Sequence, residues 1–543
     1  MYGGKTGRDH LGLGSVSSDR ILPSLSPSIN VQTNHPRYYS FYAFLLDEYW
    51  QRNLSRTQKT WEDFFRPRDF LFSLAANLCE NPEHGEMRSI VGSDKTSTLA
   101  DLAKQNKKHF AYDPDYIQSP FSGYGLYYRT VMAEMGIIFP GGKNLPYPVD
   151  VPTPAGKKLA EAFRSGIRNT RYYQEYFDTA HSKISVEVIK EYIQNACLCQ
   201  LKTSNAPDRD IALDVFLHFG RDGEPEARRE TFRMFLDIAN QTVKKGVSED
   251  EFRQLLYFRE TDNGHHYSPS ADVHETYLRW RLYQAREYYA FALNGLWLHL
   301  CEWGVDMGGD YQPLHINEFW KHLEKALDFR SLAKWFELPP CRLGPNSSFS
   351  DLLTWLSETV KAKPGKFDEV CKISSPLNEH NLLVEAMEKS SPPFVMTAGL
   401  LTMLGLIVLR FRDSPLQRSP VWEVARMGAE VRLSMDSFIR NLDRFMKVSH
   451  PTIVEVMRWI YENNVILQHE LVATSKLPEN TFRFQRDGDY LQFFNLSNSL
   501  GFMNSRYDAI STTIYELGLC GDLHEPKHAL TQDGRTLLQT GDL

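Results

Sequence analysis

The sequence predicts a mainly α protein: a multi-helical body around a long central helix, with winged-helix-like modules that carry small β-hairpins. Three observations predict it. Apolar residues recur at alternating steps of four and three from Leu278 to Leu300, which is the spacing of one helix face. Helical spacing continues over most of residues 185–389. The pattern T-x-x-G-[KR]-x-L occurs twice, at Thr153 and Thr531, each time after short extended pieces.

The central helix is expected between Ser268 and Gly304. Pro269 suits a first helical turn, Asp272 and Glu275 have capping-box spacing, and Gly304, followed by Gly308-Gly309, is expected to end the helix. From Tyr288 onward nearly every side is apolar, and a helix of that kind is buried on all sides. The pattern predicts a structural post and no functional site.

Length and composition predict several globular domains. A chain of 543 residues has room for roughly three or four domains. We expect a helical segment with an aromatic motif at 1–105, a basic winged-helix-like module at 106–175, a helical core at 176–412, and acidic winged-helix-like modules at 420–543. The net charge of −7 argues against a surface that binds nucleic acid everywhere, but allows one basic face.

Cysteine usage and hydropathy predict a cytoplasmic protein. The seven cysteines are sparse, and the Cys197-x-Cys199 pair lacks a second pair or a histidine at zinc-like spacing, so we expect reduced, buried thiols and no metal. The N-terminal residues contain no apolar core typical of a signal peptide. The uncharged segment Phe394–Leu409 is shorter than the roughly 20 residues of a membrane span and predicts a buried helix.

Three segments of the chain, two of them rich in aromatic residues, resemble segments of a known family. They read RYYSFYAFLL from Arg37, IVGSDK from Ile90 and WRLYQAREYYAFALNGLW from Trp280. Between about residues 11 and 300 these segments resemble an uncharacterised bacterial family associated with helicase-linked, anti-phage gene neighbourhoods. The resemblance implies a role in defence and a protein partner such as a helicase or nuclease. The residues themselves are apolar and aromatic, which indicates core packing and assigns no catalytic residue.

The two T-x-x-G patterns predict a repeated module. A helix from Tyr124 to Met135 is followed by a Pro/Gly-rich excursion, and Thr153 then opens another helix. This order resembles the end of a winged helix-turn-helix, and it recurs after residue 507. A separate hairpin is expected where Asp487-Gly488 lies between aromatic alternations, and with the preceding helices it predicts a further winged-helix-like fold beside the terminal one.

The search for catalytic chemistry predicts no catalytic residue and no cofactor. No complete P-loop, zinc-protease, hydrolase or deaminase motif is present. His299 and Glu302 lie three apart on the central helix, as metal ligands can, but too few further donors accompany them. We expect His299 to be a satisfied core histidine.

Charge distinguishes the two predicted modules. Residues 107–171 contain nine basic and five acidic residues, 9 − 5 = +4, whereas residues 500–543 contain three and six, 3 − 6 = −3. Because lysine and arginine drive phosphate binding, we expect Lys157, Lys158, Arg164 and Arg168 to contact DNA phosphates and Arg129 to lie near a groove. The alternative is a solvated basic face. The acidic module is expected to dock another protein.

These observations favour a non-catalytic adaptor or nucleic-acid-engaging subunit of a multi-protein bacterial complex, in phage defence. One alternative is a nuclease or another enzyme whose carboxylates are dispersed along the chain. A tight cluster of three acids with a lysine would favour that alternative. The other is a pure protein–protein scaffold, which would scatter the basic residues of 107–171 over several faces.

Overall fold

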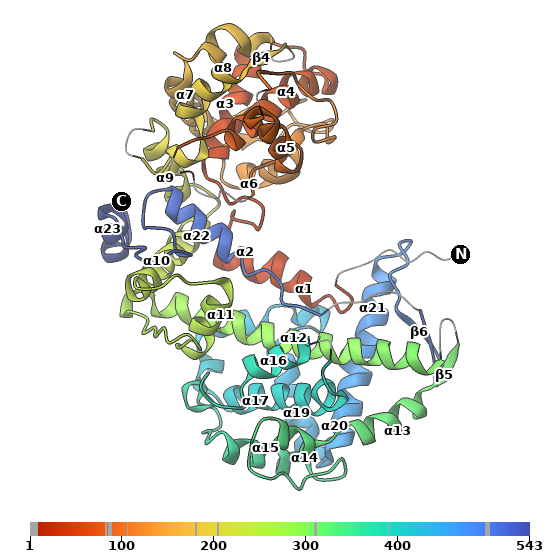
Figure 1. Cartoon of the computed structure of the whole chain (residues 1–543). Coiled ribbons are helices and arrows are strands. Elements are labelled where there is room, and N and C mark those ends of the chain that lie inside the picture. Colours follow the sequence, from red (N-terminus) through yellow and green to blue (C-terminus); the bar gives the residue numbers. More distant parts are fainter. Residues whose placement is uncertain are drawn as a thin grey trace. The chain divides into compact units, whose positions relative to one another are not determined.

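Two compact, mainly helical units make up the chain (Figure 1). The computed structural model describes residues 9–81, 84, 89–105, 107–179, 182–203, 206–308, 312–388, 390–494 and 500–543. Unit 1 comprises residues 1–22 and 250–505, and unit 2 comprises 23–249 and 506–543. The units therefore do not follow the consecutive order of the four expected segments. The C-terminal residues return to unit 2, where the N–H of Lys527 donates to the carbonyl of Val243 over 2.7 Å.

The helices and strands of each unit have the following bounds. Unit 1 holds α1 Leu13–Val16, α12 His274–Gly308, α13 Ile316–Ala326, α14 Phe329–Trp335, α15 Phe349–Thr359, α16 Glu379–Met387, α17 Leu400–Phe411, α18 Glu423–Arg426, α19 Met435–Ser449, α20 Ile453–Ile460, α21 Leu467–Ser475, β5 Pro313–His315, β6 Phe484–Asp487 and β7 Tyr490–Phe493. Unit 2 holds α3 Arg37–Gln51, α4 Gln58–Asn77, α5 Ser93–Lys104, α6 Arg129–Glu134, α7 Pro154–Ile167, α8 Val186–Ala196, α9 Arg209–His218, α10 Glu224–Thr242, α22 Tyr507–Glu516, α23 Gln532–Thr540, β1 His109–Phe110, β2 Ile138–Phe139, β3 Val151–Pro152 and β4 Ile184–Ser185. Helices α2 Leu22–Leu25 and α11 Glu249–Phe258 cross the boundaries between the units.

Helix α12 is the central post of unit 1. Its 35 residues are buried on nearly every side between Tyr277 and Gly304, and it packs along α17 (Figure 1). This confirms the predicted post and corrects its start, and of the glycines expected to end the helix it is Gly308 at which the helix stops. The α-helix begins at His274, after a short 3-10 turn, and it continues through Gly304 to Gly308. Gly304 serves packing instead, because a Cβ at that position would lie 2.4 Å from the ring of Phe493.

The apolar segment after residue 394 forms a π-turn, Val395–Gly399, followed by α17. Every residue of α17 is buried, as predicted for a core helix. Near its end the Arg410 guanidinium makes a bidentate pair with Glu379, at 2.7 and 2.9 Å, inside the core. In the described part of the chain no helix has both the length and the apolar character needed to cross a bilayer.

The predicted hairpin at Asp487-Gly488 is present. Strands β6 and β7 pair antiparallel with Asp487 opposite Tyr490, and Gly488 has a φ of 58° at the turn. Strand β5 adds to the other side of β7, which gives a three-stranded sheet in the order β5-β7-β6. This hairpin belongs to unit 1 and the Thr531 pattern to unit 2, so the two are not parts of one module.

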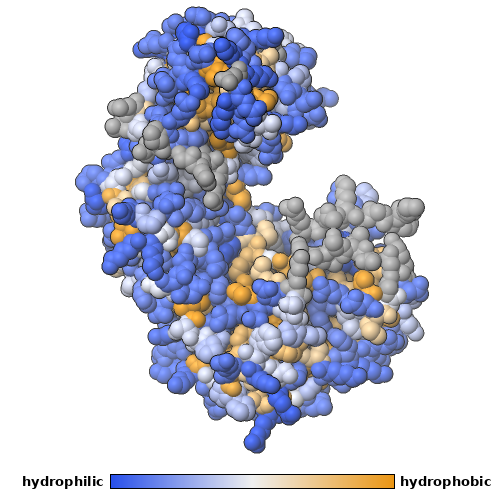
Figure 2. Space-filling view, viewed as in Figure 1, coloured by the Kyte–Doolittle hydropathy of each residue, from blue (hydrophilic) through white to orange (hydrophobic). Residues whose placement is uncertain are grey.

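Aromatic side chains fill the core of unit 2, as the sequence predicts. Helix α3, which carries the RYYSFYAFLL segment, is buried along most of its length and packs on α7. Phe41 stacks on Phe72 with ring centroids 4.0 Å apart, and Tyr38 stacks on Tyr42 at 5.4 Å. On the visible face, the surface around these cores is mainly hydrophilic (Figure 2).

The first T-x-x-G pattern joins α6, the short hairpin β2–β3 and α7. The Thr153 hydroxyl donates to the carbonyl of Gly136 over 2.7 Å and accepts from the N–H of Gly156 over 3.2 Å. Gly136 has a φ of 67°, a left-handed backbone conformation that residues with a side chain rarely adopt. A Cβ on Gly156 would lie 2.2 Å from the carbonyl oxygen of Ile137, so close backbone contact requires glycine at that position.

The second pattern repeats these contacts between α22 and α23. The Thr531 hydroxyl donates to the carbonyl of Gly518 over 2.8 Å and accepts from the N–H of Gly534 over 3.1 Å. Gly518 has a φ of 73°, and a Cβ on Gly534 would lie 1.9 Å from the oxygen of Leu519. The two patterns therefore form the same local junction, although the segment between α22 and α23 pairs through an isolated antiparallel bridge, Cys520–Leu530, where β2 and β3 form a short hairpin.

Candidate functional site

Three of the five residues predicted to bind nucleic acid are exposed along one helix. Lys157 and Lys158 lie in the first turns of α7, and Arg168 caps its C-terminal end. Lys143 is exposed on the loop between β2 and β3. Over the described residues, none of these four cations pairs with a carboxylate, so their charge faces solvent.

Arg129 has a structural role instead of the expected place near a groove. Its guanidinium donates to both carboxylate oxygens of Asp150, over 2.7 and 2.9 Å, and to the carbonyl of Gly141 over 2.7 Å. Asp150 also accepts from the hydroxyl of Tyr124 over 2.6 Å and is almost fully buried. These hydrogen bonds raise the pKa of Arg129 and tie the β2–β3 loop to the helix before it.

Arg164 is likewise engaged inside unit 2. Its Nε donates to Glu48 on α3 over 2.6 Å, and its two terminal nitrogens bind Asp47 and Glu161. Only 11% of its side chain is exposed. A guanidinium that already neutralises three carboxylates is not available to a phosphate, so Arg129 and Arg164 are left out of the proposed interface.

The β2–β3 hairpin also exposes apolar side chains. Phe139, Leu145 and Tyr147 are 51%, 48% and 42% exposed, and the rings of Phe139 and Tyr147 lie 6.5 Å apart. Large exposed aromatic groups beside a lysine are unusual on a solvated face. The hairpin therefore contributes exposed apolar side chains to the module whose exposed cations lie on α7.

The acidic C-terminal segment has little free charge. Most of its carboxylates bind basic groups within unit 2, in the pairs Asp508–His524, Glu516–His35, Asp522–His524, Asp533–Arg209 and Asp542–His218. These contacts hold the segment against its own unit. The prediction that it docks a partner through acidic charge therefore gains no support.

A group of metal-binding side chains that the sequence did not predict lies in unit 2. The ligand atoms of Cys79, His84, Cys197 and Cys199 all lie within 4.8 Å of one another. The Cys79 and Cys199 sulfurs are 3.9 Å apart, and Nδ1 of His84 is 3.1 Å from the Cys197 sulfur. We call these four residues the cysteine–histidine cluster.

The ends of two packed helices position this cluster. Cys79 follows the last residue of α4 by two positions, Cys197 caps α8, and Cys199 lies in the 3-10 turn after it. The N–H of His84 donates to the carbonyl of Asn81 over 2.8 Å. Each donor is therefore held by local backbone structure, and the packing of α4 on α8 brings the two pairs together.

Buried polar groups next to the cluster bind its backbone and approach one of its sulfurs. Arg37 donates to the carbonyl of Cys197 over 2.5 Å and pairs with Asp208, with both side chains fully buried. The amide of Gln200 lies 3.9 Å from the Cys199 sulfur as a donor. Hydrogen bonds from the other two thiols hold the pKa of Cys79 well below its usual range, whereas burial raises that of Cys197.

The sequence contained a signal for this cluster. Cys79-x4-His84 and Cys197-x-Cys199 are both pairs of metal-binding residue types at short spacing. Zinc-like spacing would place the second pair near Cys197 in the sequence, whereas the fold supplies it from more than a hundred residues away. The expectation that the pair lacks a histidine partner is corrected by this packing.

His299 is a satisfied core histidine, as predicted. Its two ring nitrogens lie 2.9 Å from the hydroxyl of Tyr461 and 3.1 Å from a ring nitrogen of His322. Burial lowers the pKa of His299 to about 3, so the ring is neutral.

Compared with models of protein families, with curated proteins and with solved structures, the chain matches none.

Proposed function

We propose that this chain is a non-catalytic, nucleic-acid-engaging adaptor subunit that contacts a phosphate backbone through α7 and the β2–β3 hairpin. The observation that carries the proposal is a set of four exposed cations, Lys143, Lys157, Lys158 and Arg168, that have no carboxylate partner in the part of the chain that the structure describes, on a chain of net charge −7. Phosphate binding is driven by such cations, because each releases condensed counterions.

The position of these cations favours a linear polyanion. Lys157 and Arg168 are eleven residues apart, about three helical turns, and so share one face of α7. Lys158 lies beside Lys157 in the same turn. The carboxylate of Glu161, on the same face, is already engaged by Arg164. The exposed face of α7 therefore carries net positive charge along its length.

The hairpin favours unstacked bases at the same surface. In proteins that bind single strands, aromatic rings stack on bases beside a positively charged groove. Phe139 and Tyr147 provide exposed rings, and Lys143 lies between them in the chain. The helix–hairpin–helix order is that of a winged helix, in which the hairpin is the wing, and this assignment belongs to the proposal.

The non-catalytic part of the proposal rests on the donors that the fold brings together. Metal-dependent nucleases use clustered carboxylates. Within the described residues, the group of three or more donors close enough to share a metal ion contains three thiols and an imidazole and no carboxylate. Membership of a bacterial complex with a helicase or nuclease, in phage defence, is proposed on the sequence resemblance alone.

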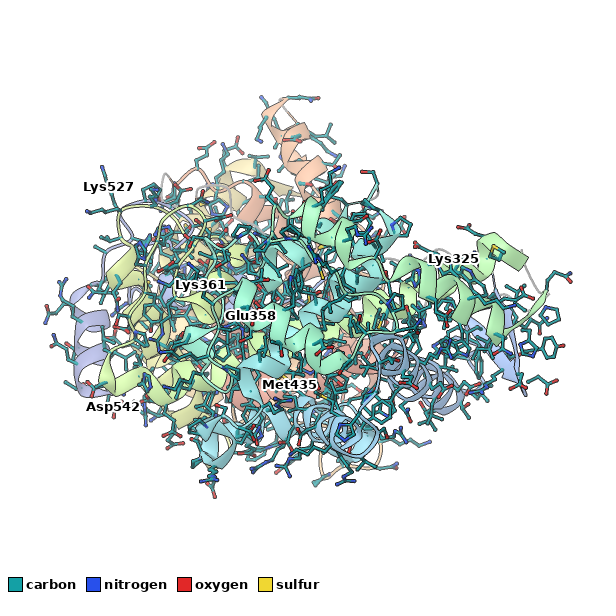
Figure 3. The ribbon with its side chains drawn as sticks, turned by 90° about the horizontal axis from the view of Figure 1, so that it is seen from below. Lys325, Glu358, Lys361, Met435, Lys527 and Asp542 are labelled. Carbon is teal, nitrogen blue, oxygen red and sulfur yellow. The ribbon has the colours of Figure 1, made fainter. Side chains whose placement is uncertain are left out.

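The test is binding of the purified chain to labelled duplex and single-stranded DNA over a salt series, beside the Lys157→Glu/Lys158→Glu variant. Each lost phosphate contact lowers the slope of log affinity against log salt by about 0.9, so two contacts remove about 1.8 and cost roughly 60-fold in affinity at 0.1 M salt. The matched control is Lys321→Glu/Lys325→Glu on α13, where both lysines are exposed; Lys325 is labelled in Figure 3.

Two results would contradict the proposal. No binding of either DNA at low salt removes the nucleic-acid function. An equal loss in the α13 control shows that net charge alone matters and that α7 is not the contact. Loss confined to the α7 variant supports the proposed surface, and the preference between duplex and single strand then reports the part played by the aromatic hairpin.

A further inference from the structure

We propose that the cysteine–histidine cluster binds one zinc ion as a structural site that joins α4 to α8. The site is independent of nucleic-acid binding and goes beyond the proposed function. It takes its donors from two stretches of unit 2, the Cys79-x4-His84 pair and the Cys197-x-Cys199 pair.

The distances fit a single tetrahedral ion. Zinc–sulfur bonds of about 2.3 Å and zinc–nitrogen bonds of about 2.0 Å at tetrahedral angles separate two sulfurs by about 3.8 Å and a sulfur from a nitrogen by about 3.6 Å. The measured separations are 3.9 Å between the Cys79 and Cys199 sulfurs and 3.1 Å between His84 Nδ1 and the Cys197 sulfur. Since no pair exceeds 4.8 Å, an ion at the centre requires displacements of at most about 1 Å.

The donor chemistry selects the ion. Three thiolates and an imidazole are soft or borderline ligands that suit zinc and exclude calcium or magnesium, which take oxygen. A cluster of several irons binds its ligands through different irons, so its ligand atoms lie farther apart than those here. The four donors complete a tetrahedron and leave no position for water or substrate, which is the form of a structural zinc site.

The surroundings support a metal thiolate better than a disulfide. Sulfurs 3.9 Å apart are far beyond the roughly 2.05 Å of a disulfide bond. Arg37 holds the carbonyl of Cys197 from a buried position, and Gln200 donates toward the Cys199 sulfur, as second-shell groups of zinc sites do. A cavity of about 300 Å³, lined in part by Cys79 and Gln200, gives an ion access to the cluster.

The position of the site indicates the role that the ion would have in the fold. It ties the C-terminal end of α4 to that of α8, and α8 in turn packs on α7. Without the ion, no metal–ligand bond would join the Cys79-x4-His84 pair at the end of α4 to the Cys197-x-Cys199 pair at the end of α8. We therefore expect the ion to stabilise the fold of unit 2 around α7.

The first test is the metal content of the full chain, purified under reducing conditions, by elemental analysis. We expect one zinc ion per chain, and replacement by Co²⁺ should give the visible absorption and thiolate charge-transfer bands of a tetrahedral sulfur site. In the Cys199→Ala variant bound zinc should fall to near zero after a chelator challenge. The matched control, Cys520→Ala, also removes a buried thiol from unit 2 and should keep its zinc.

A conservative variant keeps the proposal testable if Cys199→Ala fails to fold. His84→Cys creates a four-sulfur set, so it should retain zinc and intensify the charge-transfer bands of the cobalt form. Three results would overturn the proposal: no zinc in the wild-type chain even after reconstitution, zinc retained in Cys199→Ala, or a disulfide within the cluster in reduced preparations.

Discussion

Substitution of Gly156 by alanine tests the junction that positions α7. The added Cβ would lie 2.2 Å from the carbonyl oxygen of Ile137, about 1 Å closer than an ordinary contact allows. That oxygen accepts the N–H of Thr153 over 3.0 Å, and the Thr153 hydroxyl caps the helix at the N–H of Gly156. The side chain cannot be accommodated by a rotamer change, because the atom it meets belongs to the backbone.

The size of the effect follows from these contacts. Loss of the threonine cap costs about 1 kcal/mol, loss of the backbone hydrogen bond about 1 kcal/mol, and the overpacking 1 kcal/mol or more. We expect Gly156→Ala to destabilise the junction by about 3 kcal/mol. Because 1.4 kcal/mol is a factor of ten, local opening of α7 should become on the order of 10²-fold more frequent.

Hydrogen exchange measured by mass spectrometry reads this opening directly. Peptides from the β2–β3 hairpin and α7 should exchange on the order of 10²-fold faster in Gly156→Ala, and peptides from α23 should do the same in Gly534→Ala. Gly142→Ala is the control, because the nearest atom to its new Cβ is the Leu145 side chain at 3.5 Å. Unchanged exchange in Gly156→Ala, or an equal change in Gly142→Ala, would refute the steric argument.

Two further predictions concern buried and titrating charge. Glu379→Gln leaves the Arg410 guanidinium buried without its counter-charge, so it should lower the free energy of unfolding of unit 1 by about 3 kcal/mol in urea, followed by tryptophan fluorescence. The matched change Glu369→Gln, at an exposed ion pair with Lys363, should leave the free energy of unfolding almost unchanged, and a similar loss in both variants would remove the argument from burial. Hydrogen bonds to two aspartates raise the pKa of His524 to about 9. Its stabilisation is therefore complete below about pH 6.5 and lost as the pH rises through about 9. Unfolding measured at both ends of that range should show His524→Gln destabilising only at the lower pH, and an equal effect at both would contradict the assignment.

Features that depend on near neighbours in the chain were predictable from the sequence. The α12 post follows from its apolar period, the β6–β7 hairpin from Asp487-Gly488, and the two T-x-x-G junctions from a pattern of seven residues. In each case the local preference and the tertiary structure agree. Of the glycines expected to end this helix, Gly308 does so, whereas at Gly304 the helix continues and the absent side chain leaves room for the ring of Phe493, almost two hundred residues away.

Features that depend on helix packing were not predictable. The sequence does not show that Arg164 faces Asp47 and Glu48, which lie more than a hundred positions earlier. The sequence-based prediction therefore gave Arg164 the same phosphate contact as Lys157, Lys158 and Arg168. The cysteine–histidine cluster was missed for the same physical reason, since its two donor pairs become neighbours only when α4 packs on α8.

Both sets of long-range contacts, those of Arg164 and those of the cysteine–histidine cluster, bear on how firmly α7 is held. The helix is held by the Thr153 junction at its start, by the ion pairs of Arg164 to α3 along its length, and by α8, whose end carries the cluster. Flexible binding surfaces lose affinity because their side chains and backbone must be ordered on association. A helix held on three sides avoids that cost for its backbone. Arg129 and Arg164 therefore hold the scaffold together. Lys157, Lys158 and Arg168, like Lys143 on the hairpin, are exposed and pair with no carboxylate among the described residues, which is why we assign the contact with a ligand to these four cations.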